Sequence, residues 1–249
     1  DMSVNNIIDI AIPTNPVAYA VDENNNLQIF NPTTTAAPIN KAITGLGLGE
    51  SIVGIDFRPA TNQLYGLTTT ALGMAKLYSF NLSTGAATGV GSGFAINTNS
   101  TQFGFDFNPT VDRIRVVTNS GQNLRLNPND GTIAATDGNI NPGSPIISAA
   151  AYTNNFVGTT STVLYVLDMG KLYKQDPPNA GTLVEIGSLG INVESLNGFD
   201  IGSKSNAAFA LLTVNGTTKV YSINLNTGTA TAGVNFPNKV KGMSVGLGF

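Results

Sequence analysis

Three aspartates recur in the same local setting and carry the clearest potential for chemistry in this sequence. Asp56, Asp106 and Asp200 each stand two residues after a glycine and directly after an apolar residue. Three carboxylates at one height could bind a cation such as calcium, or act as acid, base or nucleophile in a glycoside hydrolase. Alternatively, each accepts a backbone N–H from an adjoining strand, because buried polar groups must find partners. We favour this structural role, with ligand or metal binding and catalysis as the alternatives.

Three arginines form a second candidate site. Arg113 and Arg115 alternate on one face of a predicted strand, and Arg125 lies on the next strand. Their planar guanidinium groups could bind a carboxylate such as Asp106, or an anionic ligand. With Asp112 beside them, an internal ion-pair network is the simpler interpretation, and we expect it rather than a ligand site.

Three residue types are absent, and this limits the chemistry of the chain. The sequence contains no His, Cys or Trp, which excludes Ser-His and Cys-His nucleophile systems and the usual zinc ligands. The net charge of −3, from 12 basic and 15 acidic residues, is too small to attract nucleic acid or an anionic membrane. No apolar run approaches the roughly 20 residues that span a bilayer. We therefore expect no nucleic acid partner, no membrane span and no cofactor.

The elements that position these residues follow from an internal repeat. A strand, a polar turn and a second strand recur five times, with Asn31, Asn81, Asn127, Asp176 and Asn224 in the turns. These turn residues are separated by 50, 46, 49 and 48 positions. Asn or Asp suits the place because its side chain can bond backbone groups two residues further on. Five hairpins at one period predict five structural units.

Each unit contains four short strands. A motif such as residues 103–107, which carries the aspartate, forms the first strand. A second strand such as residues 113–117 follows the motif, and the hairpin supplies the last two strands. Strands that are apolar on both faces indicate sheets packed between two neighbours, as in a propeller blade. Helical periodicity is nearly missing. The sequence therefore predicts an all-β fold, a five-bladed β-propeller with four-stranded blades.

The two ends of the repeat region indicate how the ring closes. The first hairpin, with a strand at residues 17–21 before it, has no inner strand, whereas residues 241–247 form a strand without a hairpin. Pairing these pieces completes one blade and removes two exposed sheet edges. We expect one propeller domain over residues 17–249, closed by the C-terminal strand joining the N-terminal blade.

Residues 1–16 fall outside the repeat and form an N-terminal extension. Within it, residues 7–12 are strongly β-prone and end at Pro13. We expect this segment to lie along its own domain. Strand donation to a neighbouring subunit, and hence self-assembly, is the alternative.

Longer motifs in the repeat resemble those of a known family. The matching segments are residues 53–61, 103–116, 123–128 and 150–155. They resemble the bacterial DUF4394 family of secreted, propeller-like domains of unknown function, over roughly residues 17 to 249. The resemblance implies an exported bacterial protein, and it implies no reaction and no catalytic residues. The N-terminal extension departs from the pattern.

These observations predict a class of function but do not identify a ligand. Charged residues make up only 11% of the chain, and with no recognisable catalytic constellation we expect a non-enzymatic, extracellular or cell-surface binding or assembly module. Recurrent strand tyrosines keep a carbohydrate-binding, lectin-like propeller as an alternative, and the aspartates keep a glycoside hydrolase. The candidate ligand-binding residues are Asp56, Asp106, Asp200, Arg113, Arg115 and Arg125, and the three aspartates are also the candidate metal site, with calcium as the ion.

Overall fold

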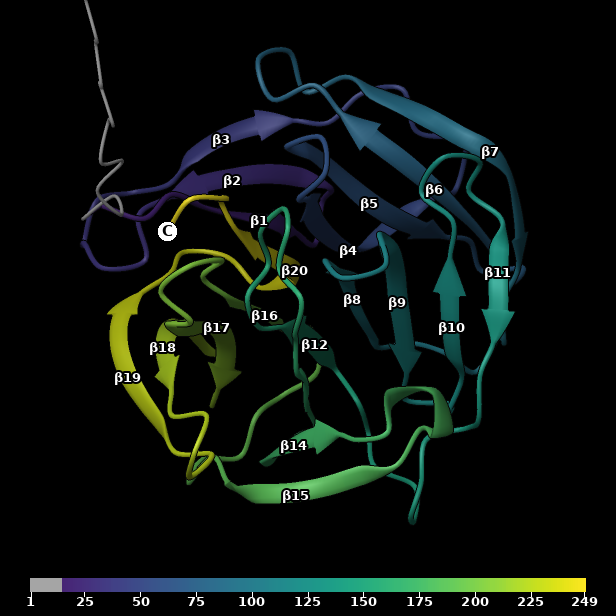
Figure 1. Ribbon diagram of the computed structural model, residues 1–249. Coiled ribbons are helices and arrows are strands. Elements are labelled where there is room, and N and C mark those ends of the chain that lie inside the picture. Colours follow the sequence, from purple (N-terminus) through teal and green to yellow (C-terminus); the bar gives the residue numbers. More distant parts are fainter. Residues whose placement is uncertain (1–14) are drawn as a thin grey trace, which may run out of the picture.

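Five four-stranded antiparallel sheets surround a common axis (Figure 1) in a computed structural model that describes residues 15–249. The inner strands β4, β8, β12, β16 and β20 lie at the centre of the ring, and β3, β7, β11, β15 and β19 lie at its rim. This confirms the predicted five-bladed β-propeller. The predicted strand at residues 7–12 lies outside the described residues.

The blades follow the chain order, and their strands run from the axis outward. Blade 1 contains β20 (Val240–Val245), β1 (Ala18–Asp22), β2 (Asn26–Phe30) and β3 (Ile39–Ala42). Blade 2 contains β4 (Ser51–Arg58), β5 (Gln63–Thr69), β6 (Met74–Phe80) and β7 (Ala87–Ala95). Blade 3 contains β8 (Phe103–Asn108), β9 (Arg113–Thr118), β10 (Asn123–Leu126) and β11 (Ile133–Thr136).

The last two blades have the same construction. Blade 4 contains β12 (Ala149–Tyr152), β13 (Leu164–Leu167), β14 (Lys171–Gln175) and β15 (Leu183–Ser188). Blade 5 contains β16 (Gly198–Ile201), β17 (Ala208–Val214), β18 (Thr217–Ile223) and β19 (Ala230–Asn235). The short 3₁₀ helix η1 (Pro178–Ala180) is the one helical element among residues 15–249. None of the helical structure described is long and apolar enough to cross a membrane.

The two ends of the described chain close the ring. Strand β20 pairs antiparallel with β1, and the register places Ala18 opposite Val245 and Ala20 opposite Met243. The C-terminal strand therefore supplies the inner strand that the first blade lacks, as the sequence predicted. Because the two chain ends pair with each other, β20 covers the inner edge of β1 and occupies the same innermost place as β4, β8, β12 and β16 do in the other blades.

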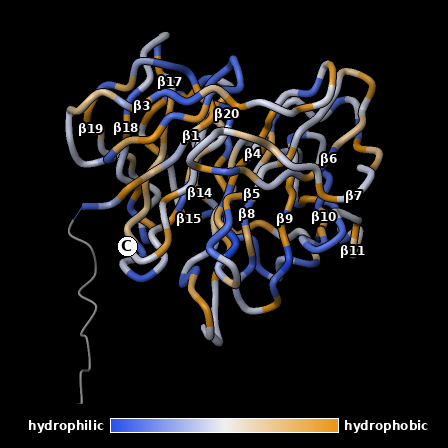
Figure 2. The backbone as a smooth tube through the Cα atoms, turned by 90° about the horizontal axis from the view of Figure 1, so that it is seen from above, coloured by the Kyte–Doolittle hydropathy of each residue, from blue (hydrophilic) through white to orange (hydrophobic). Residues whose placement is uncertain are grey.

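Apolar side chains fill the space between adjacent blades. Five buried clusters are present, one for each pair of neighbouring blades. Aromatic rings meet edge to face across these boundaries, as Tyr65 of blade 2 and Phe107 of blade 3 do with ring centroids 5.5 Å apart. Figure 2 shows hydrophobic residues along the strands and many hydrophilic residues in the connecting loops. Burial of both sheet faces explains why the strands are apolar without strict alternation.

Asparagine side chains shape four of the five repeated turns. In each, Oδ1 accepts the backbone N–H two residues further on, at 2.9–3.1 Å; the residues are Asn31, Asn81, Asn127 and Asn224. This confirms the role predicted for these residues. Asp176, in the fourth turn, instead pairs with Lys174 at 2.8 Å.

The inner strands approach one another so closely that one repeat position has almost no room for a side chain. This position lies two residues before each aspartate and carries Gly54, Gly104, Ala149, Gly198 and Gly242 around the ring. A Cβ atom on Gly198 would lie 2.4 Å from the Met243 Cβ of the next blade, and one on Gly54 would lie 2.5 Å from the Phe105 Cβ. Packing between blades therefore favours glycine here, and in blade 4 it accepts a residue no larger than alanine.

A methyl group at this position should loosen the ring. We expect Gly198→Ala to lower the free energy of unfolding by about 2–3 kcal/mol, because the inner strands must move apart to accept it. Urea unfolding followed by circular dichroism measures the change. Gly170→Ala is the control, since the nearest atom to its Cβ would be 3.9 Å away. An equal effect of the two substitutions would contradict the packing argument.

Candidate functional site

The three predicted aspartates meet at the axis of the ring. Asp56, Asp106 and Asp200 lie on β4, β8 and β16, and each is 1% exposed. Each offers a carboxylate oxygen within 4.8 Å of those of the other two. The repeat therefore brings together residues that are up to 144 positions apart in sequence, as the difference between 200 and 56 shows.

Each aspartate binds the backbone of the next blade around the ring. Asp56 Oδ2 accepts the Phe107 N–H at 2.8 Å, and Asp106 Oδ2 accepts the Tyr152 N–H at 2.7 Å. Asp200 Oδ2 accepts the Val245 N–H at 2.5 Å. In each case the donor is the residue that follows the equivalent position in the neighbouring blade. These carboxylates thus join adjacent inner strands, which is the structural role expected for them.

Two blades lack the aspartate at this position. Blade 1 carries Ser244, whose hydroxyl donates to Asp56 Oδ1 at 2.8 Å. Blade 4 carries Ala151, which has no polar side chain to reach blade 5. The ring is therefore asymmetric, and the carboxylates of three blades share a small region that is closed to solvent.

Burial and proximity oppose ionisation of these carboxyl groups. Burial raises the pKa of Asp56 to about 6, although hydrogen bonds from Phe107 and Ser244 lower it. Burial, together with the charges of Asp56 and Asp200, raises the pKa of Asp106 well above its usual range. Burial and the charge of Asp56 do the same for the pKa of Asp200. The cluster therefore holds protons that free aspartates would release.

The carboxylate cluster meets only part of the coordination requirement of calcium. Calcium binds about six to eight oxygen ligands, and one oxygen of each aspartate already accepts the N–H of the next blade. The remaining carboxylate oxygens and the Ser244 hydroxyl fall short of that number. The absence of a required cofactor stays a prediction, which the melting experiment below addresses.

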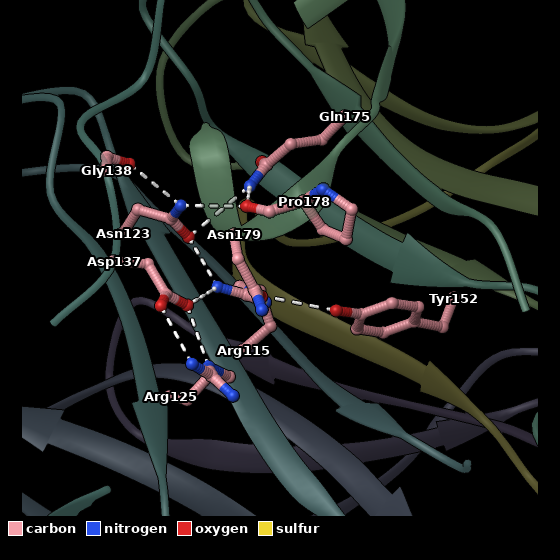
Figure 3. A network of polar contacts seen from close by, with 9 residues as sticks. All are labelled: Arg115, Asn123, Arg125, Asp137, Gly138, Tyr152, Gln175, Pro178 and Asn179. Atoms are coloured by element: carbon pink, nitrogen blue, oxygen red, sulfur yellow. Dashed lines mark hydrogen bonds and ion pairs between the residues drawn. The ribbon is translucent and has the colours of Figure 1, made fainter. Parts of the chain in front are cut away.

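Two of the three arginines form a buried ion-pair network (Figure 3). Arg115, on β9, donates to Asp137 Oδ2 at 2.6 Å, and Arg125, on β10, donates to both oxygens of Asp137 at 2.8 and 2.9 Å. Arg115 also reaches Asn179 of blade 4 at 2.7 Å. Burial raises the pKa of Asp137, but the hydrogen bonds from Arg125 and Arg115 outweigh it, so the pKa is lowered.

This geometry corrects part of the arginine prediction. The partner of the arginines is Asp137, and Asp106 is occupied near the axis by Tyr152 N–H instead. Arg113 does not join the network, because its Nη1 donates to the backbone carbonyl of Asp112. The spacing of Arg113 and Arg115 predicted that they share one face of a strand. It could not predict that Asp137 is the acidic partner, because the fold decides which chain segment lies beside that face.

Asp112 also has a partner that the sequence did not indicate. Its carboxylate accepts two hydrogen bonds from Arg58 of blade 2, at 2.9 and 2.5 Å. Arg58 donates as well to Asn129 at 2.8 Å. Arginine side chains therefore tie blade 2 to blade 3, and blade 3 to blade 4. Arg58, Arg115 and Arg125 thus all bind side chains of the protein itself.

A pocket of mixed polar and apolar character lies at the end of the ring where the inner strands begin. We call it the mouth pocket; it has a volume of about 270 Å³ and is lined by Ser51, Val53, Thr69, Ser100, Thr101, Gln102, Phe103, Ser148, Leu196, Asn197 and Lys241. All five blades contribute to this lining. It contains hydroxyl and amide groups, one cation and no carboxylate.

Sequence reasoning missed the mouth pocket, although the repeat contained a signal for it. One residue of every blade, three positions before the aspartate position, lines the pocket: Val53, Phe103, Ser148, Asn197 and Lys241. The neighbouring glycine and aspartate positions keep their residue types in most blades, whereas this position differs in all five. A search for the variable position within a regular repeat would have found it.

A constriction separates the mouth pocket from the carboxylate cluster. Going along the inner strands, the next residues surround a cavity of about 10 Å³, walled by Gly54, Phe105, Ala150, Gly198 and Met243 among others. This volume is at the lower limit for a single water molecule. A ligand in the mouth pocket therefore cannot reach the buried aspartates without displacement of the inner strands.

The buried carboxyl groups should make the protein less stable as the pH rises. Because their native pKa values exceed that of an unfolded aspartate, the native state binds more protons between pH 4 and the raised values, and stability falls across this window. We expect the free energy of unfolding to be about 2 kcal/mol larger at pH 5 than at pH 7.5, since one pKa unit corresponds to about 1.4 kcal/mol. Urea titrations at both values measure it.

Asp106→Asn should reduce this pH dependence, because an amide retains an acceptor for the Tyr152 N–H and carries no charge. Asp176→Asn is the control, since that carboxylate is 51% exposed and outside the cluster. If Asp106→Asn keeps the pH dependence of the wild-type free energy of unfolding, that dependence does not come from the carboxylate cluster. Melting in calcium chloride and in EDTA completes the experiment: equal melting temperatures are expected, and a calcium-dependent rise would identify a cation site.

Comparison with known proteins agrees with this architecture. TolB from Acinetobacter baumannii has a TM-score of 0.52 at 15% identity, over 90% of this chain and 54% of that protein. A protein of unknown function from Bacteroides thetaiotaomicron has a TM-score of 0.57 at 12% identity, over 92% of this chain and 58% of that one. The chain thus spans little more than half the length of these two proteins. At such identities the likeness shows the fold alone.

The family comparison covers most of the sequence. A search of curated proteins finds no match to this chain. The model of a family described as a domain of unknown function, DUF4394, matches residues 26–245, a span that includes parts of all five blades. The chain therefore belongs to the DUF4394 family, as its repeated motifs indicated.

Proposed function

We propose that this chain is a non-enzymatic binding module that takes a small polar ligand in the mouth pocket. The observation that carries the proposal is the convergence of all five blades on one pocket, where hydroxyl and amide groups stand beside apolar surface from Val53, Phe103 and Leu196. Its volume of about 270 Å³ is just below the range of roughly 300–1,000 Å³ usual for small-molecule sites. A ligand about the size of a sugar unit fits such a space.

The variable position in the repeat supports a specific ligand. Packing requires small residues two positions before the aspartate, and inter-blade bonding favours the aspartate itself. The pocket position keeps no single residue type: it carries valine, phenylalanine, serine, asparagine and lysine in the five blades. Phe103 and Val53 also pack in the cluster between blades 2 and 3. Five different side chains around one cavity suit an asymmetric molecule that offers both polar and apolar faces.

The location of the acidic residues supports binding without catalysis. A glycoside hydrolase needs two carboxyl groups that flank the scissile bond of a bound substrate. The lining of the mouth pocket contains no carboxylate, and the aspartates beyond the constriction are 1% exposed and bonded to neighbouring blades. The glycosidase alternative would require the inner strands to separate.

The proposal includes an extracellular or cell-surface location in a bacterium, for which the family resemblance and the low content of charged residues are the support. Self-assembly through residues 1–16 is the alternative to packing of this segment along its own domain. Among residues 15–249, the rim strands of the blades have unpaired outer edges to which a β-prone segment could add. Strand β3, where Ile39 is 66% exposed, offers one such edge.

Ligand-observed NMR with a panel of monosaccharides, hydroxy acids and amino acids tests the binding proposal. We expect at least one compound class to bind, and Thr101→Trp to abolish that binding, because this exposed residue stands in the lining of the mouth pocket. Thr160→Trp is the matched control. It alters an exposed threonine in another cavity, of about 350 Å³, at the opposite end of the inner strands between blades 3 and 4.

The two tryptophan variants separate the possible outcomes. Binding that survives Thr101→Trp but is lost in Thr160→Trp would move the site to the opposite face. Absence of binding across the whole panel would refute the proposal. Incubation with a set of nitrophenyl glycosides should release no product; turnover that Asp106→Asn removes while the fold persists would show a glycosidase.

Removal of residues 1–16 tests the assembly proposal. If this segment donates a strand to a neighbouring subunit, the full chain forms oligomers and the truncated chain is a monomer with an unchanged melting temperature, because the described ring begins with β1 at Ala18. Light scattering after gel filtration gives both masses. A full chain that is already monomeric, or an oligomer that survives the truncation, would rule out assembly through this segment.

A further inference from the structure

The mouth pocket contains a single charged group, and its surroundings leave that charge without a counter-ion. Lys241, on β20, is the one ionisable residue in the lining. Its ammonium group donates to Asn25 Oδ1 and to Ser51 Oγ, both at 2.7 Å. Both acceptors are neutral. Within residues 15–249, no carboxylate lies within 4.0 Å of Lys241 Nζ.

Asp22, whose charge acts on Lys241, directs its hydrogen bonds elsewhere. Asp22 Oδ1 accepts the backbone N–H of Asn24 and Asn26, and its Oδ2 accepts the side-chain amides of Asn26 and Gln28, at 2.8–3.1 Å. The Asp22 carboxylate therefore stabilises the loop after β1 and accepts no hydrogen bond from Lys241. Burial lowers the pKa of Lys241, while the charges of Asp22 and Glu23 raise it less, as expected for an ammonium group that lacks a close counter-ion.

The wall formed by blades 4 and 5 is held in place by hydrogen bonds. Ser148 and Asn197 contact each other at 2.8 Å, and the Asn197 amide nitrogen lies 3.1 Å from the carbonyls of Glu194 and Leu196. Leu196 has a positive φ of 70°, a conformation that a leucine adopts only when its surroundings enforce it. This wall of the pocket therefore has a fixed shape, which reduces the entropy lost when a ligand binds.

Another wall offers a hydrogen-bond acceptor. Gln102 Oε1 has no hydrogen-bond partner within the described part of the chain, and hydroxyl groups of Ser100 and Thr101 stand beside it in the lining. A buried acceptor without a donor costs about 1–3 kcal/mol. The Gln102 side chain must rotate to bring this buried atom into the pocket, where a ligand hydroxyl group would supply the donor.

We propose that the ligand of the mouth pocket is a polyhydroxylated carboxylate, such as a uronic acid, whose carboxylate binds Lys241 and whose hydroxyl groups bind the other walls. This inference rests on the proposed function and adds the chemical class of the ligand. Charge-assisted hydrogen bonds to an ammonium group are stronger than neutral ones. The hydroxyl and amide lining matches the rest of such a molecule.

Isothermal titration with matched sugars tests the inference. Sodium glucuronate and glucose differ at C6, as do sodium galacturonate and galactose, so each pair compares a carboxylate with a hydroxymethyl group. We expect the better acid to bind at least about tenfold more tightly than its neutral counterpart, which corresponds to about 1.4 kcal/mol. The preference should shrink in 0.5 M sodium chloride, because the lysine is only half-buried and its interaction is screened.

Substitutions of Lys241 test whether its charge causes the preference for the acidic sugar. Lys241→Met should bind acid and neutral sugar equally, and Lys241→Arg should keep the preference for the acid. Lys219→Met is the matched control, since Lys219 lies on β18 outside the pocket. Melting curves of all variants establish that the fold persists, and the arginine variant keeps the test valid if the methionine variant unfolds.

The outcomes distinguish this inference from the function on which it rests. Equal affinity for acids and neutral sugars, or a preference that survives Lys241→Met, overturns the carboxylate assignment and leaves the binding function intact. Failure of all four sugars to bind also overturns it. The wider compound panel described above then decides, independently, whether the mouth pocket binds small molecules at all.

Discussion

The close approach of the five inner strands at the axis is the constraint on which this structure depends. Strands that converge on one line leave no space for side chains, so four glycines and one alanine occupy the tightest position. Backbone N–H groups of these strands face the neighbouring blade and lie away from water. Asp56, Asp106 and Asp200 accept three of them, and unsatisfied groups there would each cost about 1–3 kcal/mol.

This solution places negative charge where it is costly. Three carboxyl groups within 4.8 Å of each other cannot all ionise in a buried site, so the native state retains protons near neutral pH. The arginine networks lie further from the axis, where Asp137 and Asp112 balance Arg115, Arg125 and Arg58. The Arg58–Asp112 pair joins blades 2 and 3, whereas Asp137 pairs with both of its arginines within blade 3. Arg115 then reaches blade 4 through its hydrogen bond to Asn179.

The same constraint determines where a ligand can bind. Packing at the axis reduces the channel to a cavity of about 10 Å³. The mouth pocket therefore ends at this constriction and does not continue to the carboxylate cluster. Residues one step before the glycine position lie just outside the constriction, and their type differs in all five blades. The five blades thus provide a regular scaffold and an irregular pocket, and the lysine at its edge gives the pocket a charge.

The sequence by itself determined the blade number, the strand order and the closure by the C-terminal strand, because these follow from a repeat of about 48 residues and from β-strand patterning, both of which are local. It also indicated that Asp56, Asp106 and Asp200 occupy one level. Only the tertiary structure decided that Asp137 is the partner of Arg115 and Arg125, that Asp112 pairs with Arg58, and that Lys241 lines the mouth pocket. Asp137 lies in the irregular segment after β11 of the same blade as its partners, whereas Asp112 and Arg58 belong to different blades. Neither the conformation of an irregular segment nor packing between blades leaves a periodic trace in the sequence.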